Sequence, residues 1–315
     1  MAVFSGRDAV FSGVRLLRRE PRLLWSMSLV YLLSFLLPQI LPYVMAWPEL
    51  SAAFETASKA IQAGAGEEAR TAAEMEQLQA RILPYQLLAF PISLAGSIVM
   101  YGAVYRAILE PGARAFGYLR MGRQEGVMLL VSLVVIFLLL VMVAAAALVI
   151  VILTAAVRMA TADPGVIGAL TFGLILVAVI LFGWAGIRLS LALPMSFSEG
   201  RFRFFESWPL TRGHGWKIFG VQMALIALVI GICLAIGLIA ILLLIVMAFA
   251  VGLGLFGDPN AIDQSMPAPE VWLPWAAAIY LGFSLLSAVL SGAMYVVIIA
   301  PIADIYRQLT TANPA

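Results

Sequence analysis

Six stretches of this chain are apolar over lengths that suit a membrane crossing. A helix needs about 20 apolar residues to cross about 30 Å of hydrocarbon. Backbone polar groups cannot stay unpaired in lipid, so each stretch is predicted to be an α-helix. The predicted spans are residues 23–46, 84–108, 127–157, 166–194, 218–256 and 272–303. The expected fold is all-α, a polytopic transmembrane bundle of six helices in a single membrane domain, residues 1–315.

The composition excludes a soluble protein of this length. Hydrophobic residues make up 63% of the 315 residues and charged residues 11%, and the mean hydropathy is +1.03. Soluble domains average about a quarter charged residues. The alternation of polar and apolar residues that marks the strands of a membrane β-barrel does not occur in these stretches.

The charges between the spans orient them, because cytoplasmic loops carry an excess of Lys and Arg. We assign the N-terminus, the segments 106–126 and 188–217, and the C-terminus to one side. That side has fifteen Lys and Arg residues against seven Asp and Glu residues, and the other side has four against ten. Both termini are therefore expected in the cytoplasm.

Three basic cytoplasmic segments and one long outer loop flank the spans. Residues 3–20 are expected to form one interfacial amphipathic helix, although an ordinary positively charged tail explains their arginines equally well. Residues 112–125 and 199–217 repeat this basic, partly aromatic character. Residues 47–83 form the one long polar loop on the outer side.

Several small residues and prolines predict local irregularities in the spans. Pro38, Pro42 and Pro91 each remove a backbone donor and should bend the first two helices. The run 218–256 is too long for one straight crossing and is expected to project outward or to break near Gly252, Gly254 and Gly257. The residues Ser284, Ala288 and Gly292 form a small-residue ridge, which serves packing within the chain or self-association.

Motifs for catalysis, cofactor binding or metal binding are absent from the sequence. It has one histidine, His214, and one cysteine, Cys233, whereas metal sites built on these residues need several ligands. We therefore expect no catalytic residues, no metal, no cofactor and no nucleic-acid partner. Ion-coupled transport is disfavoured because residues 127–157 and 218–256 contain no charged side chain, and transport pathways usually have ionisable residues at membrane depth.

The segment from Arg188 to Trp216 carries the one recognisable pattern. Arg188 precedes Pro194, which ends the expected helix, and Glu199 follows. Residues 205–213 read Phe-Glu-Ser-Trp-Pro-Leu-Thr-Arg-Gly and lead into the next span. This pattern resembles a bacterial family of membrane proteins related to the membrane domain of glycerophosphoryl diester phosphodiesterases. The close match covers about 35 residues of the chain. Pro209 departs from the helix expected at this position.

The resemblance implies a six-helix membrane domain of the bacterial inner membrane with a link to lipid or envelope metabolism. It does not imply phosphodiester hydrolysis, which the family's enzymes perform with a separate soluble barrel that uses paired histidines, acids and a metal. This chain has neither room for such a barrel nor a second histidine.

The same segment supplies the candidate site. Arg188 is expected near the cytoplasmic headgroups, where its guanidinium must reach a phosphate or pair with Glu199, Glu206 or Asp304. Gly213 is expected to end a helix in the left-handed conformation, and Trp208 and Trp216 suit the membrane interface. Two interpretations remain open, a structural clamp between the fourth, fifth and sixth helices and a site for an anionic lipid headgroup. The candidate residues are Arg188, Pro194, Glu199, Glu206, Ser207, Trp208, Thr211, Arg212, Gly213, Trp216 and Asp304.

The sequence thus predicts a non-catalytic, multi-pass inner-membrane protein that serves as an envelope- or lipid-associated module. Its expected partners are the lipid bilayer, with anionic phospholipid, and a membrane or envelope protein. The alternative is a transporter or channel for an apolar or amphipathic solute.

Overall fold

The computed structural model of the chain describes residues 5–45, 68–112, 115–161, 163–250 and 269–311. Its backbone contacts divide the chain into two compact units. Unit 1 comprises Met1–Ser26, Leu94–Val221 and Val296–Ala315, and unit 2 comprises Met27–Ser93 and Gln222–Tyr295.

The described residues are helical apart from short turns, and strands are absent from this part of the chain. Among the described residues, six segments are long and apolar enough to cross a membrane: Pro21–Pro42, Leu83–Leu109, Arg123–Ala160, Pro164–Glu199, Gly215–Ile239 and Ile279–Thr311. Each overlaps one predicted span. The prediction of an all-α membrane fold with six spans is confirmed.

The helices fall into three sets with respect to the two units. Elements wholly in unit 1 are α1 (Gly6–Val10), α2 (Ser12–Arg19), η2 (Ala115–Tyr118), α7 (Arg123–Ala160), α8 (Pro164–Leu189), α9 (Ala192–Glu199) and α10 (Ser207–Leu210). Elements wholly in unit 2 are η1 (Leu32–Leu36) and α4 (Leu37–Met45). Elements with residues in both units are α3 (Pro21–Tyr31), α6 (Glu68–Leu109), α11 (Gly215–Ala250) and α13 (Pro269–Thr311).

The N-terminal segment forms two short helices instead of the single helix expected over residues 3–20. The helix is interrupted at Phe11, between α1 and α2, where the buried hydroxyl of Ser12 donates to the carbonyl of Ala9 at 2.7 Å. Helix α2 packs directly on α13, since a Cβ added to Gly13 would lie 2.6 Å from the Cα of Val297. One face of the segment therefore packs on protein. Residues 3 and 4 lie outside the described residues.

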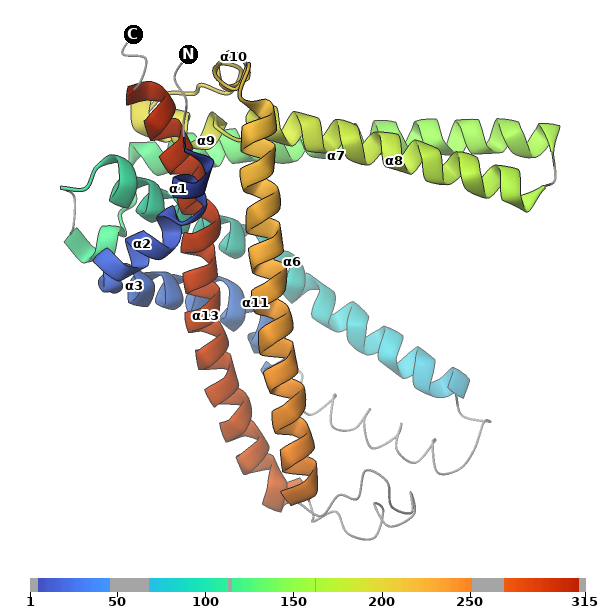
Figure 1. Ribbon diagram of the computed structural model, residues 1–315. Helices are drawn as coiled ribbons and strands as arrows, with labels where there is room; N and C mark the ends of the chain where they lie inside the picture. Colours follow the sequence, from blue (N-terminus) through green and yellow to red (C-terminus); the bar gives the residue numbers. More distant parts are fainter. Residues whose placement is uncertain (1–4, 46–67, 113–114, 162, 251–268, 312–315) are drawn as a thin grey trace. The chain divides into compact units, whose positions relative to one another are not determined.

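The two ends of the described chain meet in unit 1. The backbone N–H of Ser5 donates to Oε1 of Gln308 at 2.9 Å, and Figure 1 shows α1 beside the C-terminal end of α13. An even number of crossings returns the chain to the side on which it began, so this contact agrees with six spans.

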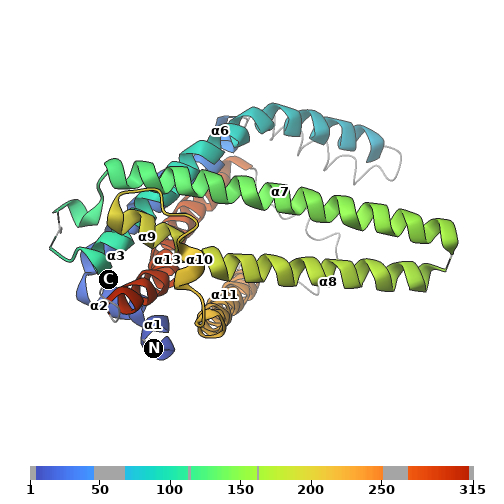
Figure 2. The ribbon, with the colours of Figure 1, turned by 90° about the horizontal axis from the view of Figure 1, so that it is seen from above.

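Helices α7 and α8 form a long hairpin within unit 1, and Figures 1 and 2 show them side by side. At 1.5 Å per residue, the 38 residues of α7 extend about 57 Å. Helix α8 begins at Pro164. Proline is favoured at the first position of a helix, because an N–H there would have no partner within the helix. Its N-cap is Asp163, whose carboxylate accepts the N–H of Gly165 at 2.8 Å.

The hairpin leaves large apolar side chains on its surface. Phe137, Leu140, Phe172 and Ile180 are 66%, 64%, 70% and 61% exposed. Exposure of apolar area to water costs about 25 cal/mol per Å², whereas lipid tails are as apolar as leucine. The surface of the hairpin therefore indicates that its solvent is lipid.

The packed part of unit 1 joins the hairpin to α9. Val131 of α7, Ala192 of α9 and Phe204 are buried together. Phe197 of α9 packs edge-on against Tyr105 of α6, with ring centroids 5.7 Å apart. These contacts fix the segment after α8 against two other helices, α7 and α6.

Pro38 accounts for an irregular turn in unit 2. Because proline has no N–H, the carbonyl of Ser34 loses its usual helical partner. The turn before Pro38 is π-helical, with the N–H of Leu37 bonded to the carbonyl of Leu32. The hydroxyl of Ser93 donates to the Ser34 carbonyl at 2.8 Å. The predicted disturbance of the first span by Pro38 takes the form of this turn.

The small-residue ridge of α13 serves packing within unit 2. Ser284 and Ala288 are buried. A Cβ added to Gly292 would lie 2.8 Å from the backbone nitrogen of Ser28 in α3. The absence of a side chain at Gly292 therefore allows α3 and α13 to approach closely, which is one of the two uses expected for the ridge.

The helix that contains the second span begins before the span itself, which runs from Leu83 to Leu109 against the predicted 84–108. Helix α6 starts at Glu68, so residues 68–83 of the expected outer loop are helical and continuous with the span, through Pro84 and Pro91. Residues 47–67 of that loop lie outside the described residues. The expected break near Gly252, Gly254 and Gly257 also lies outside them.

The close approach at Gly292 can be tested by adding one methyl group. Gly292→Ala should lower the free energy of unfolding by about 1–3 kcal/mol, because the new Cβ overlaps backbone that cannot move alone. The measurement is thermal or denaturant unfolding in detergent.

Gly282→Ala is the matched control on the same helix. A Cβ at Gly282 meets nothing within 4 Å, so the change should leave stability unaltered or raise it by up to about 1 kcal/mol. Equal losses of stability in the two variants would contradict the close packing of α3 and α13.

Candidate functional site

The last turn of α8 carries Arg188, the first of the predicted site residues. The helix ends at Leu189, five residues before the predicted end of the span, and α9 starts at Ala192. Pro194 lies buried in the first turn of α9, where its missing N–H has no helical partner to lose. The break between the two helices thus places Arg188 at a helix end.

The guanidinium of Arg188 lies against two tryptophans. Its Cζ is 5.7 Å from the ring centroid of Trp184 and 5.7 Å from that of Trp208. The two indole rings meet edge to face, with centroids 4.8 Å apart. A cation over an aromatic face gains about 0.5–2 kcal/mol. The atom Nη1 of Arg188 is buried and has no hydrogen-bond partner among the described residues.

Helix α10 holds Trp208 in this position. The buried hydroxyl of Ser207 donates to the carbonyl of Arg188 at 3.0 Å and to that of Phe204 at 2.9 Å. The first of these bonds satisfies a carbonyl at the C-terminal end of α8, which has no partner within its own helix. Ser207 therefore joins α10 to the end of α8.

The turn after α10 depends on a left-handed residue. Pro209 lies within the single turn of α10, where a helix tolerates proline. Thr211 is buried, and its hydroxyl donates to the carbonyl of Trp208 at 3.0 Å. Gly213 has φ of +83°, as predicted, and this conformation favours glycine. It separates α10 from α11.

Of the two arrangements expected for Arg188, contact with a phosphate or pairing with an acid, the structure does not show the second, because the three acids pair with other arginines. Glu199 lies 2.7 Å and Glu206 3.7 Å from the guanidinium of Arg203. Asp304 is buried, pairs with Arg307, and accepts a hydrogen bond of 2.8 Å from Gln308. Each acid has a basic partner three or four residues away, and such neighbours meet at little entropic cost.

The remaining predicted residues are at the surface. Arg212 is exposed and Trp216 is 86% exposed. The structure thus brings together Arg188, Ser207 and Trp208, and it adds Trp184, which the sequence analysis missed. A tryptophan one helical turn before an interfacial arginine was the available signal.

A second charged centre in unit 1 was also missed. Arg106 of α6 and Glu125 of α7 form an ion pair and are only 2% and 5% exposed. Arg106 also donates to the carbonyl of Tyr118 at 2.6 Å and lies 5.5 Å from the ring centroid of Phe197. From the sequence alone, both charges are assigned to the cytoplasmic segment 106–126.

Two features around this pair show that the backbone is adapted to it. Tyr118 has φ of +68°, a conformation that costs about 1–3 kcal/mol in a residue other than glycine. The bond from Arg106 to its carbonyl helps to hold it. On α6, a Cβ added to Gly102 would lie 2.9 Å from Oε1 of Glu125, so glycine leaves room for the carboxylate. The pair is a structural link between the second and third spans.

Breaking the buried pair should be costly. Glu125→Gln leaves Arg106 buried without its counter-charge and should lower the free energy of unfolding by about 3–5 kcal/mol. If this variant does not fold, the double variant Arg106→Met, Glu125→Met should recover part of the yield, because an apolar pair leaves no buried charge.

Glu199→Gln is the control, since it removes an exposed ion pair with Arg203 that is worth about 0–1 kcal/mol. Unfolding in detergent at neutral pH measures all of these variants. Similar small losses in Glu125→Gln and Glu199→Gln would refute the structural role of the buried pair.

In chemical terms, the arrangement around Arg188 leaves a buried guanidinium nitrogen without a hydrogen-bond partner among the described residues, beside two indoles. No three His, Cys, Asp or Glu side chains within the described residues gather closely enough to hold a metal ion. Comparisons with protein-family models, with curated proteins and with solved structures give no match for this chain.

Proposed function

We propose that this protein is a non-catalytic, lipid-associated module of a bacterial inner membrane, with both termini in the cytoplasm, and that Arg188 binds the headgroup of an anionic phospholipid. Its six spans make it a multi-pass membrane protein. The resemblance of residues 188–220 to a membrane-domain family linked to lipid metabolism supports the lipid association. Any catalysis in its pathway would then belong to a membrane or envelope partner.

The observation that carries the proposal is the unpartnered Nη1 of Arg188. A buried donor that makes no hydrogen bond costs about 1–3 kcal/mol, and more when it is charged. The acids expected to neutralise Arg188 are engaged by Arg203 and Arg307. A phosphate oxygen would satisfy both the free N–H and the charge.

The surroundings of Arg188 suit the membrane interface. Trp184 and Trp208 are 49% and 41% exposed, and tryptophan concentrates at the headgroup level of membranes. Their indoles can cover the edge of a lipid while the guanidinium contacts its phosphate. The clamp contacts of Ser207 are compatible with this role, because they hold Trp208 and so help to orient the arginine.

Lipid-dependent stability tests the proposal. The protein is placed in nanodiscs of phosphatidylcholine alone or with one third phosphatidylglycerol, and thermal unfolding is measured. Phosphatidylglycerol should raise the melting temperature of the wild type by about 2–4 °C for each kcal/mol of binding. This increase should be lost in Arg188→Gln.

Arg201→Gln is the matched control, because Arg201 is exposed in the same cytoplasmic segment and the net charge changes equally. It should keep the full increase. The same increase in Arg188→Gln as in Arg201→Gln would rule out Arg188 as the headgroup site. Arg188→Lys, which keeps the charge, replaces the glutamine variant if that protein does not fold.

A further inference from the structure

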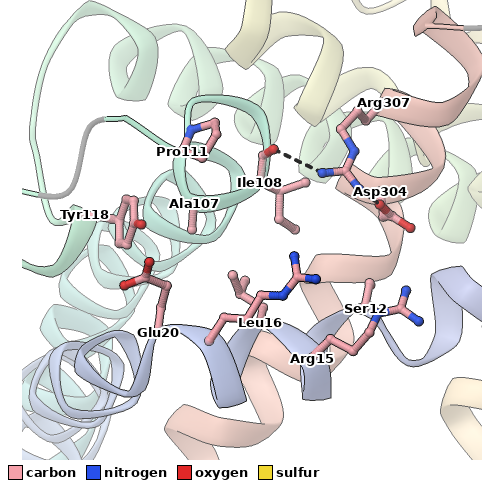
Figure 3. A pocket seen from close by; sticks show the side chains of 11 residues that line it. Ser12, Arg15, Leu16, Glu20, Ala107, Ile108, Pro111, Tyr118, Asp304 and Arg307 are labelled. Carbon is pink, nitrogen blue, oxygen red and sulfur yellow. Dashed lines mark hydrogen bonds and ion pairs between the residues drawn. The ribbon is translucent and has the colours of Figure 1, made fainter.

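A cavity of about 440 Å³ lies within unit 1, away from Arg188. Figure 3 shows that its side chains come from α2 and the following Glu20, from the end of α6 with Pro111 and Tyr118 after it, and from the C-terminal part of α13. Its volume falls in the range of about 300–1,000 Å³ that is usual for small-molecule sites.

The cavity lies where three spans end. Arg19 and Glu20 directly precede the span Pro21–Pro42, and Ala107 and Ile108 are in the last turn of the span that ends at Leu109. Leu16, Ala107 and Ile108 give the cavity an apolar wall. Residues at span ends lie at the level of lipid headgroups, so the cavity combines an interfacial position with both charged and apolar lining.

Two of the three arginines on its lining already have carboxylate partners. Arg15 lies 3.3 Å from the carboxylate of Asp8. A hydrogen bond from Ser5 and the charges of Arg15 and Arg7 lower the pKa of Asp8, so it stays ionised at neutral pH. These two charges offset each other at the rim.

Arg307 is the second engaged arginine. It pairs with the buried Asp304, and its Nη1 points toward the carbonyl of Ile108 at 3.5 Å (Figure 3). Glu20 also lines the cavity, and this residue is not free.

Arg19 is different, because its exposed guanidinium has no ion pair or hydrogen bond with any described residue. We propose that this cavity binds the phosphodiester of an anionic lipid headgroup and that Arg19 is its principal ligand. One free guanidinium matches the single negative charge of a phosphodiester, and its parallel N–H groups fit two phosphate oxygens. The apolar wall would contact the glycerol and the first acyl carbons.

This inference deepens the proposed association with lipid, but it concerns a separate site. The cavity shares no residue with the cluster of Arg188, Trp184 and Trp208. Either site can therefore fail while the other is retained. A dissolved phosphate ion offers the same oxygens without the apolar part, so the test must separate the two sources.

Adjacent arginines on α2 provide the test. Arg18 and Arg19 are both exposed, and of the two only Arg19 lines the cavity. Wild type, Arg19→Gln, Arg18→Gln and Arg188→Gln are titrated in detergent with phosphatidylglycerol, and bound lipid is counted by native mass spectrometry. Each titration is repeated with excess inorganic phosphate.

Arg19→Gln should weaken one lipid-binding step about fivefold, the factor for losing one arginine near a phosphate. Arg18→Gln should bind as the wild type does, and inorganic phosphate should not displace the lipid. Equal binding by Arg18→Gln and Arg19→Gln would overturn the inference. Displacement of the lipid by inorganic phosphate would contradict the assignment of a lipid as the ligand of this cavity. Unchanged binding in Arg188→Gln with a loss in Arg19→Gln would support this cavity while refuting the site at Arg188.

Discussion

An unpaired backbone group in hydrocarbon costs several kcal/mol, and this constraint governs how the chain is built. Each span is helical because a helix pairs its own backbone. Where the helix is interrupted, a side chain supplies the missing bond. The hydroxyl of Ser93 serves the carbonyl freed by Pro38 in unit 2, and the hydroxyl of Ser207 serves the carbonyl of Arg188 at the end of α8 in unit 1. Ser207, which completes the backbone at the end of α8, also holds Trp208 beside Arg188 in the candidate site.

Three arginines at the span ends differ in burial and pairing, and these differences indicate which of them serve structure and which can bind a ligand. Arg106 is buried and fully paired with Glu125, which suits a permanent link between spans. Arg188 is held by two tryptophans and keeps one buried N–H without a partner. Arg19 is exposed and unpaired among the described residues, beside a cavity. A paired charge has little to offer a ligand, whereas the two unpaired ones retain their capacity to bind phosphate.

The six spans could be predicted because length and hydropathy alone determine them, and Gly213 could be predicted because only a left-handed turn needs glycine there. The full length of α6 was less predictable, because its start at Glu68 lies in a polar stretch that hydropathy does not assign to a span. The pair of Arg106 and Glu125 was missed because a count of loop charges does not show which of them meet in three dimensions. The acids considered as partners of Arg188 pair instead with Arg203 and Arg307, and the sequence contained the reason, since these arginines lie three or four residues from the acids. The transport alternative and the family resemblance stay predictions.

The central claim is that this membrane protein holds anionic lipid, and the most direct measurement is native mass spectrometry of the purified wild type, followed by extraction and identification of what it carries. We expect anionic phospholipid in stoichiometric amounts after extensive washing in detergent. A chain that carries no lipid, or only zwitterionic lipid in variable amounts, would contradict it.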